Sequence, residues 1–231
     1  MGFAHCREPF TRDVRRHVNA SSDPRLIRCL DGLDMSFAML EHIYAELHAT
    51  CARIRTDKHQ LAPAFWRCWS SIDTVHRVRE VSVSVPGLGA KTPQLKMFLS
   101  ATSIAEGFRH YIQHLRKEIS KSPGNTFPVW GSLSWVDPDD ASLTHMVMAG
   151  AQVGETSYVG CVFDTVRRCW VSNVALNVNQ LSFNFDPIFD ECMKFREFVI
   201  PWLLEKYSPG VQVREELPIS SVRLQFVARD A

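Results

Sequence analysis

The sequence predicts an α+β protein in which an antiparallel helical bundle of about four long helices carries an inserted antiparallel β-sheet of about five strands. Two patterns support this fold class. Apolar residues recur at spacings of three and four in residues 24–121 and again in residues 187–207. Between these segments, residues 127–185 contain short alternating runs separated by turn residues. A chain of 231 residues is long enough to bury a core of this size.

Three helices are expected before the sheet. The first begins at Asp23 and Pro24, because aspartate is a favoured N-cap and proline suits the first helical position, and it is expected to end near Arg55. Residues 61–82 form the second helix and residues 93–121 the third, each with one apolar face. Apolar faces this wide need partners, so the helices are expected to pack against one another.

The sheet is expected to be antiparallel, because its strands follow one another too closely for crossover connections. Turns rich in aspartate, glycine and threonine separate them. The predicted strands are residues 128–136, 143–150, 158–164, 169–178 and 181–185.

A fourth helix is expected after the sheet. Asp186 and Pro187 repeat the start signature of the first helix, and the apolar pattern continues to about Tyr207. Pro201 lies inside this segment and is expected to kink or shorten the helix. A last strand is predicted at residues 222–227. The predicted organisation is a basic N-terminal arm (1–22), a helical segment (23–126), the sheet (127–185) and a final segment (186–231) that packs on both.

Composition limits the class of function. The net charge is +1, so a nucleic-acid partner requires a local basic patch. The seven cysteines include no Cys-x-x-Cys pair, which argues against a disulfide framework and a zinc ribbon. No apolar run approaches the roughly 20 residues of a membrane span, and the N-terminus has no hydrophobic signal core. We therefore expect a cytoplasmic protein with reduced thiols, no membrane partner and no cofactor.

The segment most suggestive of chemistry is EGFRHYIQHLRKEI, residues 106–119. On a helix, Glu106, His110 and His114 are spaced four apart and lie along one edge, whereas Arg109 lies about 140° around the axis from His114. One interpretation is a solvated helix edge on which the glutamate supports the histidines. A second is a metal site with Glu106, His110 and His114 as ligands, because histidines four apart on a helix can bind zinc.

A third interpretation is acid–base chemistry on a phosphodiester. A histidine titrates near neutrality and can transfer a proton, and an arginine can bind a phosphate through two hydrogen bonds. Arg109 and His114 together supply groups that can cleave RNA without a metal, with the ribose 2′-OH attacking the adjacent phosphorus.

The run RHYIQH, residues 109–114, resembles the Arg-x4–6-His motif of HEPN domains, in which a polar residue often follows the arginine. HEPN domains are all-α bundles with two long antiparallel helices, and the motif lies on a late helix. Residues 24–121 are similar to this arrangement. The resemblance implies that Arg109 and His114 form the catalytic pair, that His110 supports it, and that Glu106, one turn earlier, orients it.

The same resemblance implies a function and a set of partners. Many HEPN proteins are metal-independent endoribonucleases that act as dimers, with two copies of the motif lining one cleft. They serve in toxin–antitoxin, anti-phage and RNA-processing systems, and some have lost activity and act as binding modules. The implied partners of this chain are RNA or a nucleotide, a second copy of the chain and an antitoxin protein.

Other features leave alternatives open. The 14 phenylalanines and six tryptophans suit a non-catalytic dimeric interaction module. Trp130 and Trp135 have opposite parity on the first predicted strand, so one is expected in the core, and burial against the helices is favoured over base stacking. On the second helix, Asp73 and Arg77 are four apart and can form an ion pair at the surface.

Overall fold

The computed structural model describes residues 23–89, 91–120, 128–150 and 159–207. The fold is α+β, as predicted: helices accompany a four-stranded and a two-stranded antiparallel sheet. The basic arm at residues 1–22 and the strand predicted at 222–227 lie outside the described residues. Within them, no helix combines the length and the apolar character that crossing a membrane requires.

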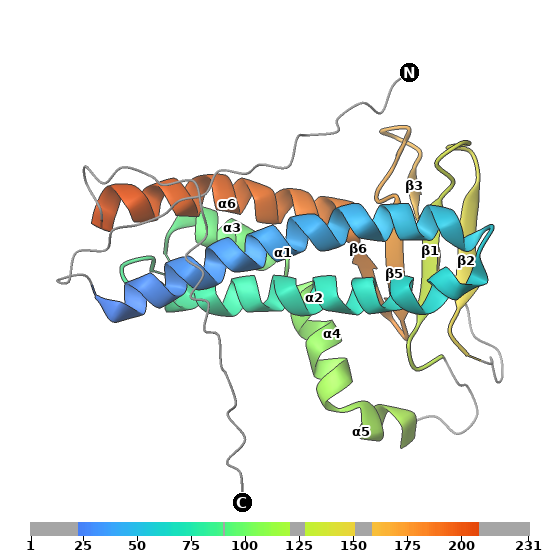
Figure 1. Ribbon diagram of the computed structural model, residues 1–231, viewed down its shortest axis with the longest axis horizontal. Coiled ribbons are helices and arrows are strands. Elements are labelled where there is room, and N and C mark those ends of the chain that lie inside the picture. Colours follow the sequence, from blue (N-terminus) through green and yellow to red (C-terminus); the bar gives the residue numbers. More distant parts are fainter. Residues whose placement is uncertain (1–22, 90, 121–127, 151–158, 208–231) are drawn as a thin grey trace, which may run out of the picture.

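Three long helices form the largest part of the structure. α1 (Pro24–Ile54) is followed by a 3-10 turn at Lys58–Gln60, after which α2 (Leu61–Ser84) returns antiparallel to it (Figure 1). α6 (Phe185–Tyr207) also packs on α1. The predicted cap of α1 is confirmed, because the Asp23 carboxylate accepts a hydrogen bond from the backbone N–H of Arg25 at 2.9 Å. The largest fully buried side chains in the core are Phe37, Phe98, Phe108, Phe183 and Phe185.

The single helix predicted over residues 93–121 is wrong. The structure divides it into α3 (Pro93–Ala101), α4 (Ile104–Gln113) and α5 (Leu115–Ser120). At the first break, the buried hydroxyl of Thr102 donates to the Phe98 carbonyl, which is a side-chain competitor for helical hydrogen bonding. α3 consequently packs on α6, whereas α4 packs on α2 and β6 and projects away from the long helices (Figure 1).

Pro201 does not shorten α6, which continues through it to Tyr207. The helix begins at Phe185, within two residues of the predicted start. The side chain of Asp186 is engaged in contacts with other elements, described below, in place of the capping role that the sequence pattern predicts.

The sheet is antiparallel throughout but is divided differently from the prediction. The predicted strand at 169–178 is two strands, and the expected sheet of five is a four-stranded sheet in the order β2-β1-β5-β6 plus a separate β3-β4 hairpin. β5 is buried at every position, and β6 packs against α4. The four-stranded sheet lies near the end of the molecule where α1 ends and α2 begins (Figure 1). The strands are β1 (Ser132–Val136), β2 (Thr144–Met148), β3 (Phe163–Asp164), β4 (Cys169–Trp170), β5 (Val174–Val178) and β6 (Leu181–Asn184).

One carboxylate joins the sheet to the end of α1. Asp137, which follows β1, receives hydrogen bonds from the Nε2 of His145 at 2.7 Å and from the Nη1 of Arg55 at 3.0 Å. The hydrogen bond from His145, together with those from the backbone N–H groups of Asp139 and Asp140, lowers the pKa of Asp137 to about 2. The carboxylate is therefore ionised at neutral pH, and it fixes the β1–β2 turn on α1.

A second carboxylate joins α1, the sheet and α6. Asp186 accepts hydrogen bonds from the Tyr44 hydroxyl at 2.8 Å and from the backbone N–H of Asn173 at 2.7 Å, and the Nε2 of His48 lies 3.2 Å away. Burial alone would raise the pKa of Asp186, but these contacts outweigh it and hold the pKa below its ordinary value. Tyr44 also stacks on Phe189, with ring centroids 3.9 Å apart.

Candidate functional site

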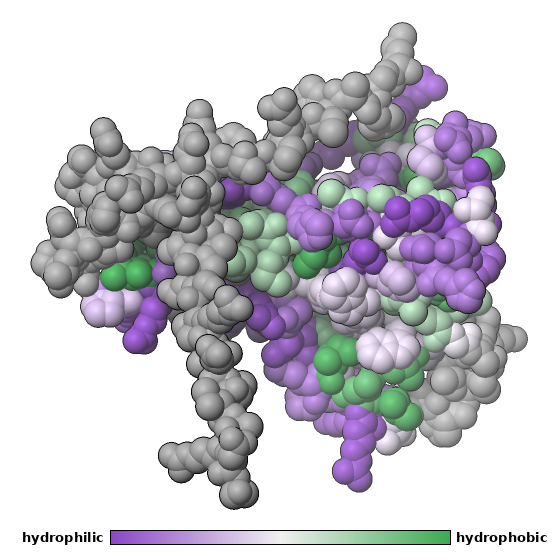
Figure 2. All heavy atoms as spheres, viewed as in Figure 1, coloured by the Kyte–Doolittle hydropathy of each residue, from purple (hydrophilic) through white to green (hydrophobic). Residues whose placement is uncertain are grey.

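α4 carries the four residues that the sequence singles out. Its apolar side, Ala105, Phe108 and Tyr111, is buried against α2 and β6. The remaining positions face α2 or solvent, so the polar residues of the motif are divided between two edges of one short helix. Where α4 projects from α2, the surface is mixed, with hydrophilic side chains beside a hydrophobic patch (Figure 2).

Arg109 lies on the edge that faces α2. Its Nη1 donates to the Oδ1 of Asp73 at 2.6 Å. The other oxygen of this carboxylate receives the Nε and Nη2 of Arg77, each at 2.8 Å, which confirms the predicted surface pair on α2. Two guanidinium groups therefore converge on one carboxylate. Both remain accessible, because the side chains of Arg77 and Arg109 are 64% and 41% exposed.

Glu106 has a different neighbour from the one that the sequence suggests. Its carboxylate forms an ion pair with Arg79 of α2, whose side chain is only 6% exposed. The same guanidinium donates to the Leu99 carbonyl at 2.5 Å and to the Thr102 hydroxyl at 2.6 Å. Glu106 thus helps to hold α4 and the end of α3 on α2, and its contact is with Arg79 in place of Arg109 or His114.

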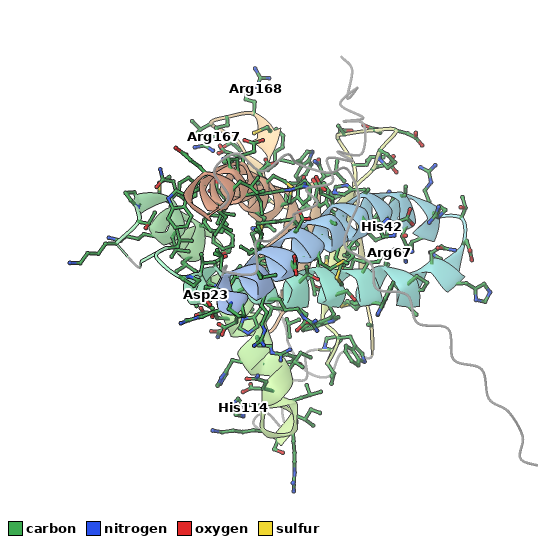
Figure 3. All side chains as sticks on the ribbon, turned by 60° about the vertical axis from the view of Figure 1, so that its left-hand side comes forward. Asp23, His42, Arg67, His114, Arg167 and Arg168 are labelled. Atoms are coloured by element: carbon green, nitrogen blue, oxygen red, sulfur yellow. The ribbon has the colours of Figure 1, made fainter. Side chains whose placement is uncertain are left out.

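His110 and His114 lie together on the solvent edge of α4. Both residues are exposed, and their ring centroids are 4.3 Å apart with an angle of 53° between the rings. His114 ends α4, and its backbone N–H donates to the His110 carbonyl at 3.0 Å. It stands near the end of the projecting segment, on the opposite side of the molecule from Arg167 and Arg168 (Figure 3). The structure brings the two histidines together and leaves Arg109 on the neighbouring edge.

The metal interpretation receives no support from the arrangement of the described residues. Among them there is no group of three histidine, cysteine, aspartate or glutamate side chains placed to hold a metal ion. Glu106, which that interpretation requires as a ligand, is paired with Arg79. The imidazoles of His110 and His114 are therefore available for proton transfer or for contact with an anion.

The surface that remains is a candidate anion-binding site. We call it the α4 face and define it by Arg77 of α2 with Arg109, His110 and His114 of α4. Sequence reasoning identified three of these residues and also the pairing of Arg77 with Asp73, but it missed the contact between Asp73 and Arg109. That contact joins residues 36 positions apart, so no local spacing pattern could have indicated it.

Next to the α4 face lies an aromatic cluster. Trp135 is buried at 3% exposure, as expected for one of the paired tryptophans, whereas Trp130 is 50% exposed. Trp130 contacts Trp69 of α2 edge to face, with ring centroids 6.1 Å apart, and Trp69 stacks on Tyr111 of α4 at 6.3 Å. Burial raises the pKa of Tyr111, and Glu118 adds to this effect, so the phenol stays protonated and donates to the Val129 carbonyl.

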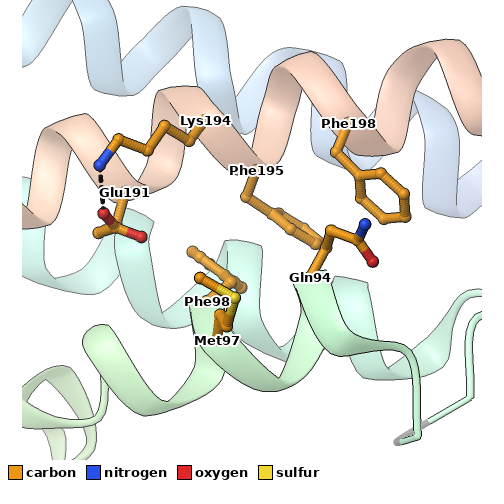
Figure 4. Close-up of a pocket in the computed structure, with 7 residues that line it drawn as sticks. All are labelled: Gln94, Met97, Phe98, Glu191, Lys194, Phe195 and Phe198. Atoms are coloured by element: carbon orange, nitrogen blue, oxygen red, sulfur yellow. Dashed lines mark hydrogen bonds and ion pairs between the residues drawn. The ribbon is translucent and has the colours of Figure 1, made fainter.

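Two other candidate sites offer little chemistry. A cavity of about 100 Å³ between α3 and α6 is mainly apolar, and its charged side chains, Glu191 and Lys194, pair with each other (Figure 4). The cavity is lined by Gln94, Met97, Phe98, Glu191, Lys194, Phe195 and Phe198.

The buried cysteine thiols are unreactive, because burial raises their pKa values. That of Cys51, for example, is raised to about 12.

No protein-family model, no curated protein and no solved structure matches this chain. The candidate function therefore depends on the motif and on the geometry of the α4 face.

Proposed function

We propose that this protein is an HEPN-like RNA-binding protein whose α4 face binds the phosphodiester backbone. The observation that carries the proposal is the convergence of Arg77 and Arg109 on a single carboxylate at an exposed position. The single carboxylate of Asp73 can neutralise only one of the two guanidinium charges, so the cluster keeps a net positive charge. Guanidinium groups in this arrangement suit the oxygens of a phosphate, which can enter beside Asp73 or displace it.

The paired imidazoles support metal-independent cleavage of the bound RNA. Cleavage by the 2′-OH requires one group to accept the hydroxyl proton and another to protonate the departing 5′ oxygen. Two exposed imidazoles in contact, His110 and His114, can divide these tasks when one is neutral and the other protonated. Arg109 would then stabilise the charge that develops on the phosphorane oxygens. In this proposal Glu106 positions α4 through Arg79 and takes no part in proton transfer.

The helical arrangement is consistent with the HEPN resemblance. α1 and α2 are two long antiparallel helices that precede the motif, and α6, which follows the sheet in the sequence, packs on α1. We propose that these helices with α4 correspond to the bundle, and that two copies of the α4 face complete one cleft in a homodimer. The sheet is the addition that distinguishes this chain from the minimal family fold.

RNA binding is tested by fluorescence anisotropy with a labelled single-stranded RNA. Arg77→Ala combined with Arg109→Ala is expected to weaken binding and to lower the slope of log K against log salt by about 1.4, because each phosphate contact on a single strand adds about 0.7. The matched control is Arg167→Ala with Arg168→Ala, on the opposite side of the molecule (Figure 3). If the control weakens binding and the α4-face variant does not, the proposed site is wrong.

RNA cleavage is tested separately, on gels, with EDTA present throughout. His110→Ala and His114→Ala are each expected to slow cleavage about 10²-fold or more, as loss of a general acid or base does. His42→Ala, which alters an exposed histidine of α1, is the matched control and should cleave as the wild type does. Cleavage at equal rates by the wild type and both α4 variants, or none by the wild type, would remove the nuclease proposal and leave RNA binding to stand on the anisotropy result.

A further inference from the structure

Trp130 is an exposed aromatic side chain held in a rigid setting. It occupies a tight turn in which the backbone N–H of Gly131 donates to the Pro128 carbonyl at 2.8 Å, and Gly131 has a φ of +88°. The preceding residue, Val129, is tied to α4 by the hydroxyl of Tyr111 at 2.9 Å. The backbone on both sides of the indole is therefore fixed, although half of the residue faces solvent.

The indole of Trp130 is also supported from one side. Trp69 meets it at an interplanar angle of 77°, which is a favoured arrangement for two aromatic rings. A ring that is braced in this way loses little conformational freedom when a ligand stacks on it, so it is preorganised for binding. An exposed, braced indole is the feature that single-strand-binding proteins use for nucleobases, because every base has a π-face.

This aromatic surface is continuous with the arginines of the α4 face. Trp69 lies four residues before Asp73 on α2, or about one helical turn, and Asp73 is the residue on which Arg77 and Arg109 converge.

We propose that Trp130 is a base-stacking platform for single-stranded RNA bound on the α4 face. One nucleobase stacks on the indole of Trp130, while Arg77 and Arg109 bind the phosphate of a neighbouring nucleotide. This inference rests on the proposed function and makes it narrower: the ligand is single-stranded, because the bases of a duplex are paired and stacked on one another and cannot reach the indole.

The test compares three labelled ligands by anisotropy: a single-stranded RNA, an RNA duplex, and a single strand of abasic ribose phosphates. Trp130→Ala is expected to weaken single-stranded RNA binding about 5-fold to 150-fold and to leave the affinities for the other two ligands unchanged. Trp130→Phe should keep most of the affinity, because phenylalanine also stacks. Met97→Ala, which removes an exposed apolar side chain of α3, is the control and should bind all three ligands as the wild type does.

The outcomes separate this inference from the proposed function. If Trp130→Ala binds single-stranded RNA as well as the wild type does, while the double variant of Arg77 and Arg109 does not, RNA binding stands and the stacking platform is refuted. Equal losses on RNA and on the abasic strand would show that the substitution disturbs the fold, which also refutes it. If the wild type binds no RNA, the proposed function fails and the inference fails with it.

Discussion

Two arginines join α4 to α2, and they differ in burial. We therefore expect very different losses in the free energy of unfolding when each is replaced by alanine. Arg79 is 6% exposed and pairs with Glu106, whereas Arg109 is 41% exposed and pairs with Asp73. Replacing each by alanine breaks one ion pair between the same two helices. The comparison therefore tests whether Arg79 is structural and whether Arg109 is available for function.

The cost of Arg79→Ala follows from its contacts. The Leu99 carbonyl and the Thr102 hydroxyl lose a charged donor inside the protein, and a hydrogen bond to a charged group is worth about 1.5–3 kcal/mol. The Glu106 side chain is 59% exposed and regains water, so its share is discounted to that of a surface pair. With the lost packing of the side-chain stem, we expect about 3 kcal/mol or more for Arg79→Ala and about 0.2–1 kcal/mol for Arg109→Ala.

The assay is urea unfolding followed by far-UV circular dichroism, with the free energy of unfolding obtained by linear extrapolation. Glu106→Gln is the informative partner variant, because it removes the charge and keeps an acceptor for Arg79. It should cost about 1 kcal/mol, clearly less than Arg79→Ala. A cost below about 1 kcal/mol for Arg79→Ala, or equal costs for the two arginines, would refute this account of how α4 is held.

Three further predictions concern single residues. Because the pKa of Asp137 is lowered to about 2, its carboxylate stabilises the fold fully above the unfolded-state pKa of ~4, and this stabilisation is lost as the pH falls through about 2. In urea titrations at descending pH, the free energy of unfolding should therefore fall less in Asp137→Asn than in the wild type. Gly131→Ala is expected to lower the free energy of unfolding by about 2 kcal/mol or more, because the new Cβ would lie 2.4 Å from the Asn177 carbonyl oxygen at a φ of +88°. Gly89→Ala is the control: open space surrounds Gly89, so its free energy of unfolding in the same urea titrations should stay within about 0.5 kcal/mol of the wild type. Asp73→Asn should raise RNA affinity and steepen its salt dependence by up to about 0.7, and weaker binding would contradict the role given to the two arginines.

Long elements with a strong periodic pattern were predictable from the sequence. The first two helices and the last one lie close to their expected limits, because each places one apolar stripe toward the core. The break at Thr102 was not predictable. The apolar spacing continues across it, and the Thr102 hydroxyl, which donates to the Phe98 carbonyl at the break, also accepts a hydrogen bond from Arg79, 23 positions away in the chain. Periodicity reports which face is buried and contains no information on a tertiary hydrogen bond of this kind.

The candidate site shows the same division. The spacing of His110 and His114 placed them on one edge, and the structure places their rings in contact there. The partners of Glu106 and Arg109 lie on α2 and are brought to them by tertiary packing. The sequence therefore predicted the contact between the two histidines but not the contacts of Glu106 and Arg109. Strand parity indicated only that one of the two tryptophans would be buried, and it does not apply to the exposed Trp130, because β1 begins at Ser132 and Trp130 lies in the turn before it.

The packing of α6 on α1 has a consequence for how the chain folds during synthesis. α1 is complete at Ile54, but the helix that covers one of its sides begins only at Phe185, about 130 residues later. At typical translation rates, this side of the first helix stays open to water for roughly 6 to 26 s on the ribosome. The nascent chain is therefore expected to need protection from self-association until its last helix emerges, and fragments that end within the sheet should be recovered only as aggregates.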